Sequence, residues 1–486
     1  MQPKETEKKH ISEFGRDNLP IQNHIIELIC IIREKYCVLV AGGAVRDHLL
    51  GKEAKDIDLC TEATPDELIQ LLESKGIEVK HVGQNFGVVL AILRNGNDEY
   101  EEVEIATFRI DGDYSDGRRP DSVAFIRNPA EDAARRDLTI NGLFYDPSDH
   151  TVIDYVGGID DMNNKVLRFI GIAPERIKED KLRMLRYVRF LLKTGFFPDE
   201  ESINAMREYA KSITTVSAER IKDELDKIFK TGPVSKALRL LKEFGLLEHI
   251  LPEVDSLSEC DQGAPYHMEG DVFKHTCMVA DGLLANSSDE LRWAAVLHDI
   301  GKPATRKETD TCKVNFIGHD SVGAEMADKI CRRLKFSNEE KEKIVWLIKN
   351  HMQVLQLPKM RPAKAKRFVL DQKLEDIHPY FQDLLSLAQA DENGAVSLEP
   401  RAEEDSFAGI LEKFNKLKAE LDLQKQSGSN ISKLINGRDV MTALNINKGG
   451  PIVGKILKAV QDKLLEMEEP TRECALGLLR EIVGEN

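Results

Sequence analysis

Residues 38–61 read VLVAGGAVRDHLLGKEAKDIDLCT, and this stretch decides the fold of the N-terminal part. It predicts a buried strand over 38–40, a Gly-Gly turn, a helix over 45–50 and then a strand that carries Asp56 and Asp58. Alternate side chains of a strand share one face, so the two carboxylates would project together. They would repel each other without a cation between them. Mg²⁺, which prefers oxygen ligands and substrate phosphates, is the expected ion.

The turn before this pair has the composition of a phosphate site. Gly42 and Gly43 allow backbone N–H groups to approach a phosphate closely, and the helix that follows adds its positive end. Arg46 supplies a guanidinium. A metal, a phosphate cradle and an arginine are the groups that nucleotidyl transfer needs, since two metal ions can clamp an in-line displacement. A solvated Asp-x-Asp loop is the alternative interpretation of the acidic pair.

Two further groups of polar residues follow in the same region. Arg135 and Arg136 offer guanidinium forks for phosphate, Asp137 offers a carboxylate for ribose hydroxyls, and Asn141 lies one predicted helical turn beyond Asp137. A surface cluster of ion pairs is the alternative. Glu104 lies in an alternating, strand-like run. It is either a third carboxylate near the metal ions or a charge at the end of a strand.

The segment Glu179-Asp180-x-x-Arg183 predicts a base-reading site. If both residues lie on one helix, positions i and i+3 are neighbours, so an acceptor and a donor stand side by side. Cytosine and adenine each present an amino donor beside a ring acceptor, whereas uracil and guanine present the reverse order. Asp180 and Arg183 would therefore admit C and A and leave U and G with unsatisfied polar groups. An exposed salt bridge is the alternative.

A second constellation occupies the C-terminal half. His298 and Asp299 are adjacent, His275 precedes them and Asp391 follows far downstream. Imidazole and carboxylate groups are good ligands for divalent transition metals. The pattern therefore predicts a metal site that is separate from the Asp56 and Asp58 pair.

These motifs, in this order over about residues 28–235, resemble the class II tRNA nucleotidyltransferases, the family of CCA-adding enzymes and bacterial poly(A) polymerases. The second constellation resembles the HD superfamily of metal-dependent phosphohydrolases, whose binuclear members have further ligands where His319 and His351 stand. The resemblance implies an α+β fold: a polymerase-β-like head with a mixed sheet and helices, followed by all-α neck, HD and C-terminal helical domains. The implied site residues are Asp56, Asp58 and Glu104 for catalysis; Gly42, Gly43, Arg46, Arg109, Arg136, Asp137, Asn141, Asp180, Arg183 and Arg186 for the nucleotide; and His275, His298, Asp299 and Asp391 for the HD metal.

The resemblance also implies a function. A CTP/ATP:tRNA nucleotidyltransferase would use Mg²⁺ to build or repair the 3′ CCA end of tRNA. The HD site would hold Ni²⁺, Mn²⁺ or Co²⁺ and could hydrolyse phosphoesters. Residues Thr107–Pro120 resemble the flexible loop that switches addition from C to A, which argues against a CC-only enzyme. An A-adding enzyme, a poly(A) polymerase and, in another class, an HD phosphohydrolase with an RNA-binding head are the alternatives; 82–87 lacks the basic pair of the poly(A) branch.

Composition predicts a cytoplasmic protein of several domains. The chain has 486 residues, 41% hydrophobic and 31% charged, and a net charge of −16 that argues mildly against nucleic acid as a partner. Basic stripes on helices are nonetheless compatible with RNA. None of the eight cysteines forms a C-x-x-C pair, and neither an apolar leader nor an 18-residue apolar run is present. The expected regions are 1–28 (polar leader and first helix), 29–165 (head), 166–255 (neck), 260–400 (HD) and 401–486 (tRNA-binding tail).

Overall fold

The computed structural model divides the chain into two compact units. The first comprises Met1–Gly232 with Lys236–Ile250, and the second comprises Pro233–Ser235 with Leu251–Asn486. The described residues are 6–54, 56–80, 86–112, 122–262, 270–308, 314–396, 406–426, 431–467 and 469–484. Parts of two segments discussed above, 81–85 and 113–121, lie outside them.

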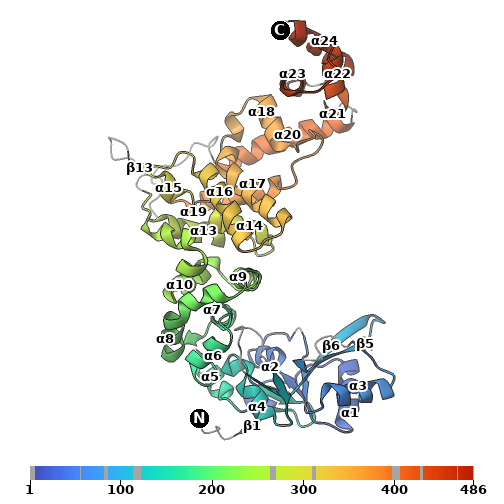
Figure 1. Ribbon diagram of the computed structural model, residues 1–486, viewed down its shortest axis with the longest axis vertical. Helices are drawn as coiled ribbons and strands as arrows, with labels where there is room; N and C mark the ends of the chain where they lie inside the picture. Colours follow the sequence, from blue (N-terminus) through green and yellow to red (C-terminus); the bar gives the residue numbers. More distant parts are fainter. Residues whose placement is uncertain are drawn as a thin grey trace. The chain divides into compact units, whose positions relative to one another are not determined.

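An eight-stranded mixed sheet forms the centre of the first unit (Figure 1). Its order is β1-β10-β9-β2-β3-β6-β5-β4, and every neighbouring pair is antiparallel except β3 and β6. The strands are β1 (Glu7–His10), β2 (Val38–Ala41), β3 (Leu59–Thr61), β4 (Glu78–Lys80), β5 (Val88–Arg94), β6 (Tyr100–Thr107), β9 (Phe144–Asp146) and β10 (Thr151–Asp154). A short hairpin of β7 (Arg109–Asp111) and β8 (Val123–Phe125) follows β6.

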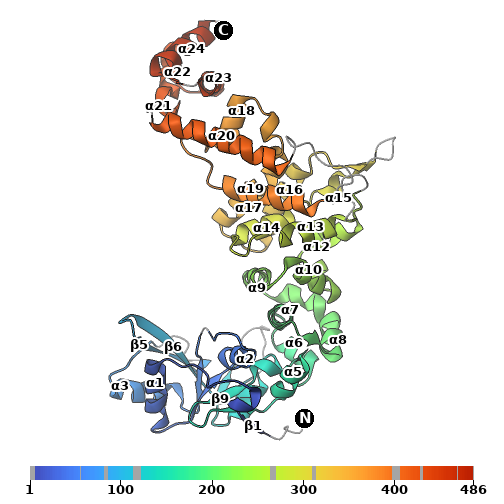
Figure 2. The same ribbon diagram turned by 180° about the vertical axis from the view of Figure 1, so that it is seen from behind.

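Alternation along the strands gives the sheet two buried faces. Val38 and Val40 of β2 join one hydrophobic core, and Leu39 and Ala41 join the other. Helices α1 (Asn23–Arg33) and α3 (Pro65–Ser74) cover the first face beside β5, as both views show (Figures 1 and 2). The opposite core is smaller and includes Ala133 of α4 (Pro129–Ala134).

Helices make up the rest of the first unit. They are α2 (Gly43–Leu49), α5 (Gly158–Asn164), α6 (Ala173–Glu179), α7 (Arg183–Thr194), α8 (Glu200–Tyr209), α9 (Ala218–Thr231), α10 (Val234–Glu243) and α11 (Leu247–Ile250), with a short parallel pair of β11 (Val166–Leu167) and β12 (Phe197–Pro198). Helix α7 is amphipathic: Leu185, Val188 and Leu191 are buried on one side. Its arginines project on the other sides.

Three expectations about this unit need correction. Residues 7–10, expected as part of a polar leader, pair with β10 and form the edge strand β1. Asp56 and Asp58 lie just before β3, in residues without regular secondary structure, and not in the strand itself. The helix after the glycine turn also begins at Gly43, two residues earlier than predicted. The mixed sheet with helices, followed by helical regions, is as predicted.

The described residues of the second unit form helices apart from the short hairpin of β13 (Lys307–Glu308) and β14 (Val314–Asn315). Its helices are α12 (Pro252–Asp255), α13 (Val272–Asp281), α14 (Asp289–Leu297), α15 (Lys302–Thr305), α16 (His319–Arg333), α17 (Asn338–Val354), α18 (Pro362–Val369), α19 (Phe381–Gly394), α20 (Phe407–Gln426), α21 (Ile431–Leu434), α22 (Gly437–Ala443), α23 (Pro451–Leu465) and α24 (Arg472–Gly484). Helices α13, α14, α17 and α19 pack together around the second constellation (Figure 1). Of the helices described in either unit, none has the length and apolar character to cross a membrane.

Candidate active site and metal centre

The turn between β2 and α2 requires glycine for two reasons. Gly42 has φ of 66°, in the region that favours glycine, and a Cβ there would lie 3.2 Å from Nη1 of Arg136. Its amide donates to the carbonyl of Leu143 at 3.1 Å, which ties the turn to the segment before β9. The missing side chain thus lets Arg136 approach the start of α2.

The acidic pair meets Glu104 through the parallel pairing of β3 with β6. Leu59 lies opposite Ile105 in the parallel pair of strands, so the residues that precede them, Asp58 and Glu104, lie next to each other. Asp58 is exposed to solvent, yet the protein atoms near its carboxyl displace water, and the charges of Glu104 and Asp56 add to this; together they raise its pKa to about 6. Carboxylate oxygens are the ligands that Mg²⁺ prefers, so these residue types fit the expected ion. Among the described residues, however, Asp56, Asp58 and Glu104 do not form a cluster of ligand atoms within 4.8 Å of one another.

Most of the residues predicted to bind the nucleotide line one cavity of about 460 Å³. Its lining residues are Gly42, Gly43, Arg46, Asp58, Arg135, Arg136, Asp137, Asn141, Asp180, Arg183, Arg186 and Phe190. A neighbouring cavity of about 290 Å³ is lined by Glu104 and Arg109, and it shares Asp58 and Arg136 with the first. Arg109 therefore belongs to the neighbouring cavity. Asp58 stands between the two, and Asp56 lines neither.

Hydrogen bonds join four lining residues into one chain. Arg46 donates to Oδ1 of Asn141 at 2.5 Å, and Nδ2 of Asn141 donates to Oδ1 of Asp137 at 2.9 Å. Arg186 donates to the other oxygen of Asp137 from Nε at 2.8 Å. Burial alone would raise the pKa of Asp137, but the charge of Arg186 and these hydrogen bonds lower it to about 2. Asp137 is therefore an anion, as its expected role requires. Asn141 lies in a 3₁₀ turn rather than on a continuous helix with Asp137.

Asp180 and Arg183 do not share a helix, which corrects the prediction. Asp180 is the extended residue that ends α6, and Arg183 begins α7. Asp180 accepts from the amide of Leu182 at 3.0 Å and from Arg220 at 2.7 Å. Arg183 instead pairs with Glu179 at 2.5 Å. Because the two residues are held by different partners and both line the cavity, neither the i,i+3 pair nor its exposed alternative is present.

Arg135, predicted together with Arg136 for phosphate, lines both cavities, whereas two residues near the larger one were not predicted. Asp132 accepts hydrogen bonds from Arg135 and Arg136 at 2.7 and 2.9 Å. Phe190 lies 4.8 Å below the guanidinium of Arg46 and also contacts Arg186 and Arg189. The spacing of Arg183, Arg186 and Phe190 along one helix face would have identified Phe190, whereas nothing in the local sequence marks Asp132.

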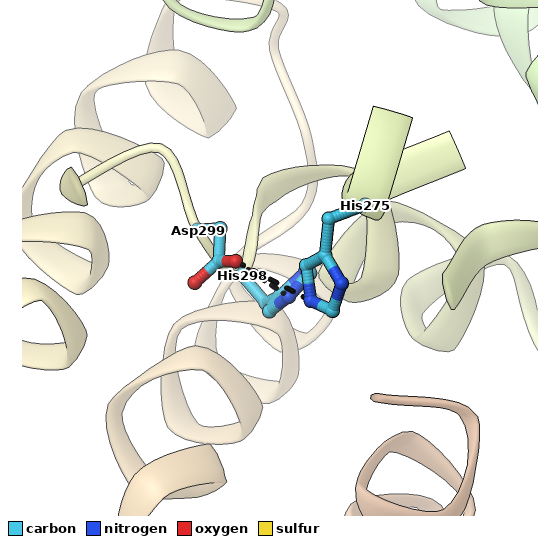
Figure 3. A group of neighbouring side chains, drawn as sticks. All are labelled: His275, His298 and Asp299. Atoms are coloured by element: carbon cyan, nitrogen blue, oxygen red, sulfur yellow. Dashed lines mark ion pairs between the residues drawn. The ribbon is translucent and has the colours of Figure 1, made fainter. Parts of the chain in front are cut away.

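The second constellation forms a buried centre around Asp299 in the second unit. His298 and His275 approach one oxygen of Asp299 (Figure 3), and their Nε2 atoms lie 3.1 and 3.6 Å from it. His319 and His351 approach the other oxygen at 3.3 and 4.0 Å. Asp391 adds a carboxylate 2.9 Å from His275. All six predicted ligands are thus brought together, and two triads that share Asp299 could each hold a metal ion.

The histidines are oriented as metal ligands usually are. Nδ1 of His298, His319 and His351 lies 2.6–2.8 Å from a backbone carbonyl, which makes Nδ1 the donor and directs the lone pair of Nε2 into the centre. Nε2 of His298 is buried and lacks a hydrogen-bond partner, whereas Oδ2 of Asp299 forms an ion pair with the ammonium of Lys302. Burial and the nearby His298 lower the pKa of His351 to about 4, so it is neutral, as a ligand must be.

Gly301 and Lys302 complete this centre. A Cβ at Gly301 would lie 2.2 Å from the carbonyl oxygen of His319, so glycine is needed for α16 to approach. Lys302 is buried, and its ammonium lies 2.6 Å from Asp299 and 2.7 Å from Oε1 of Gln262. A cavity of about 350 Å³ opens beside these groups. Its apolar walls are Phe316, Ile317, Met352 and Leu355.

Three family models match the chain. Residues 38–168 match the poly A polymerase head domain, 195–257 match the probable RNA and SrmB-binding site of polymerase A, and 272–377 match the HD domain. The head match contains Asp56, Asp58 and Glu104, and the HD match contains five of the six residues of the metal centre, all but Asp391.

Curated relatives agree with these matches. The chain is 30% identical to the A-adding tRNA nucleotidyltransferase of Deinococcus radiodurans, over 87% of this chain and 90% of the relative. It is also 30% identical to the CCA-adding enzyme of Staphylococcus saprophyticus, over 88% of this chain and 90% of the relative. The CCA-adding enzyme of Bacillus pumilus is 37% identical over 57% of this chain, and that match spans 63% of the relative's length.

Solved structures show the same fold. A crystal structure of the Bacillus stearothermophilus CCA-adding enzyme in complex with CTP has a TM-score of 0.64 and 23% identity, and the match covers 96% of this chain and 99% of that one. The similarity therefore extends through the helical parts as well as the head.

Proposed function

The chain belongs to the family of tRNA nucleotidyltransferases that includes CCA-adding and A-adding enzymes, and on this premise we propose that it adds C and A to the 3′ end of tRNA from CTP and ATP. The observation that carries the proposal is the cavity of about 460 Å³, which joins glycines, arginines and carboxylates from separate segments of the chain beside Asp58. These groups suit a nucleoside triphosphate and a metal ion together.

In the proposed reaction the 3′-hydroxyl of tRNA attacks the α-phosphate, and pyrophosphate leaves. Divalent ions held by Asp56 and Asp58, with Glu104 nearby, would stabilise the charge on the reacting phosphates. Arg46 and the glycine turn bind the triphosphate, and Arg136, Asp137 and Asn141 bind the ribose. Asp58 stands between the two cavities, so we assign the triphosphate to the larger cavity and the 3′ end of tRNA to the smaller one.

Base choice is assigned to the end of α6 and the start of α7. Each oxygen of Asp180 has one described hydrogen-bond donor, and each keeps a further lone pair. Arg183 donates to Glu179 and to the carbonyls of Arg176 and Arg135, which fixes its guanidinium and leaves Nε–H unused in the described network. An acceptor and a donor on rigid supports suit the amino edge of cytosine or adenine.

One assay separates this proposal from its alternatives. Transfer RNA that ends before CCA is incubated with CTP alone, with ATP alone and with both, in the presence of Mg²⁺. A CCA-adding enzyme extends by CC with CTP and completes CCA only with both nucleotides. An A-adding enzyme adds A only to tRNA that already ends in CC, and a poly(A) polymerase extends further with ATP alone.

We also propose that the HD centre binds a divalent transition metal and hydrolyses phosphoesters such as cyclic phosphates at damaged tRNA ends. The two buried triads of His and Asp ligand atoms that share Asp299 support metal binding, and nitrogen ligands favour Mn²⁺, Co²⁺ or Ni²⁺ over Mg²⁺. Metal analysis of the purified protein tests the first part, and hydrolysis of 2′,3′-cyclic phosphates with each metal tests the second. A cytoplasmic location is proposed as well, since the seven described cysteines are free thiols.

A further inference from the structure

A separate cavity of about 430 Å³ lies on α17, α18 and the loop that follows. Its lining residues are Glu342, Trp346, Asn350, Gln353, Lys364, Arg367, Phe368, Leu370, Asp371, Gln372, Leu374, His378 and Tyr380. None of them lines the cavity of the HD centre, although both cavities use α17. The functions assigned above therefore leave this cavity without a role.

Stacked aromatic rings form one wall. The rings of Trp346 and His378 lie 4.0 Å apart with an angle of 8° between their planes. Tyr380 meets Trp346 edge-on, with ring centroids 5.9 Å apart. Burial lowers the pKa of His378, so this imidazole is uncharged at neutral pH. An uncharged aromatic wall of this kind is a surface on which a heterocyclic base stacks.

The loop that carries His378 is held in place by its own hydrogen bonds. The amide of Asp371 donates to the carbonyl of Asp376 and that of His378 to the carbonyl of Val369, both at 2.8 Å. The amide of Tyr380 donates to Nδ1 of His378 at 3.3 Å. Nδ1 is therefore the acceptor, and Nε2 carries the proton. The cavity is thus preformed and offers a fixed N–H donor.

Acceptors are arranged around the same wall. Asn350 donates from Nδ2 to the carbonyl of Trp346 at 2.7 Å, and this fixes the carboxamide and leaves its Oδ1 as an acceptor. The carboxylates of Glu342 and Asp371 also line the cavity. An exocyclic amino group, as in adenine or cytosine, matches these acceptors, whereas the O4 of uracil does not.

The charged side chains that line this cavity limit how many phosphate groups a ligand can carry. Arg367 is already paired with Asp462, with Nε at 2.8 Å, so it is neutralised. Lys364 is exposed and forms no ion pair with any residue that the structure describes. A single cation beside two carboxylates suits one phosphate and would repel a triphosphate.

We propose that this cavity binds one nucleotide unit with a single phosphate and an amino-bearing base, by stacking it on the Trp346–His378 wall. The unit is either an unpaired nucleotide of RNA or a free nucleoside monophosphate. Both sources present the same base and the same phosphate, and they differ in the length of chain attached.

Tryptophan fluorescence tests this proposal directly. The sequence holds two tryptophans, Trp293 and Trp346, and Trp293 is 1% exposed. Neither lies in the nucleotidyltransferase head, so nucleotide binding there has no indole beside it. The full chain is titrated with AMP, CMP, UMP and ATP, and separately with a short single-stranded oligoadenylate. AMP and CMP should quench saturably, and UMP and ATP should be at least about tenfold weaker. The Trp293→Phe variant should keep the quench.

Matched variants localise the signal. Lys364→Glu and Asn350→Ala should weaken AMP binding about tenfold or more. Lys349→Glu makes the same charge change at an exposed site of α17 that does not line the cavity, and it should leave binding unchanged. Asp299→Asn, in the HD centre, should also leave it unchanged. Tighter binding of the oligonucleotide than of AMP identifies RNA as the source, and equal or weaker binding identifies the free nucleotide.

Three outcomes overturn the proposal. They are the absence of saturable quenching by every ligand, equal affinity in wild type, Lys364→Glu and Asn350→Ala, and loss of the quench in Asp299→Asn. The last result would assign the signal to the HD centre. Circular dichroism of each variant excludes unfolding as the cause of a lost signal.

Discussion

Replacement of Asp180 by asparagine isolates the proposed base reading, because the two side chains have the same shape. Asp180 accepts two hydrogen bonds, from the amide of Leu182 and from Arg220. An asparagine keeps one acceptor and turns the other into an N–H donor. That donor faces either Arg220 or the amide of Leu182, and in both cases a hydrogen bond is lost.

The size of the expected change in base selectivity follows from the polar groups involved. A base amino group that meets an N–H donor in place of a carboxylate loses a charge-assisted hydrogen bond, and this costs about 2–3 kcal/mol. In the Asp180→Asn variant, the uracil O4 can instead accept a hydrogen bond from the asparagine N–H. The ratio of kcat/KM for CTP to that for UTP should therefore fall by about 30- to 150-fold. The loss of the Arg220 pair should lower the stability by about 1 kcal/mol, since both side chains keep some contact with water.

Single-nucleotide addition with each of the four triphosphates measures this ratio. Glu175→Gln is the matched control: Glu175 is an exposed carboxylate of the same helix α6 and does not line the nucleotide cavity. This control should leave the ratio unchanged. If Asp180→Asn slows all four nucleotides equally, Asp180 supports the structure and does not read the base.

Three other predictions follow from the same structure. Asp56→Ala and Asp58→Ala should each abolish nucleotide addition while the unfolding transition stays near that of the wild type, and near-normal addition by either folded variant would refute their assignment to the metal ion. Asp137→Asn should lower the free energy of unfolding by about 2 kcal/mol at pH 7, since a shift of the pKa from 3.8 to about 2 is worth roughly that much. Because the folded pKa is depressed, this contribution is present above about pH 4 and is lost as the pH falls toward 2, so urea denaturation at pH 7 and pH 3 should show the gap between wild type and variant narrowing. Asp299→Ala should remove bound transition metal and any hydrolysis of cyclic phosphates while addition with Mg²⁺ persists; a parallel loss of addition would show that the two centres are coupled.

Structural features that depend on residues close in the sequence could be predicted, whereas features that depend on contacts with distant residues could not. The glycine turn, β2 and α2 follow from a run of 12 residues or fewer and are present with small shifts at their ends. The strand β1 has a polar sequence, EKKH, and exists because it pairs with β10 more than 140 residues later. No local periodicity identifies such an edge strand.

The break between α6 and α7 shows the same limit on a smaller scale. The sequence KEDKLRM has no glycine or proline, so a continuous helix is the natural expectation. The carboxylate of Asp180 bonds the amide two residues on, which gives the backbone an alternative to the helix. Ligand types at the HD centre were predictable from the order of His and Asp. The direction of each imidazole depends on carbonyls that only the packed helices supply.

The hydrogen-bonded chain from Arg46 through Asn141 and Asp137 to Arg186 has a kinetic consequence. It links the residues assigned to the triphosphate with a residue that borders the base site, so a base that displaces Arg186 also disturbs Arg46. A mismatched nucleotide would then bind through its phosphates almost as well as a matched one but would hold its α-phosphate out of line. Selectivity among nucleotides should therefore appear mainly in kcat, with KM nearly constant.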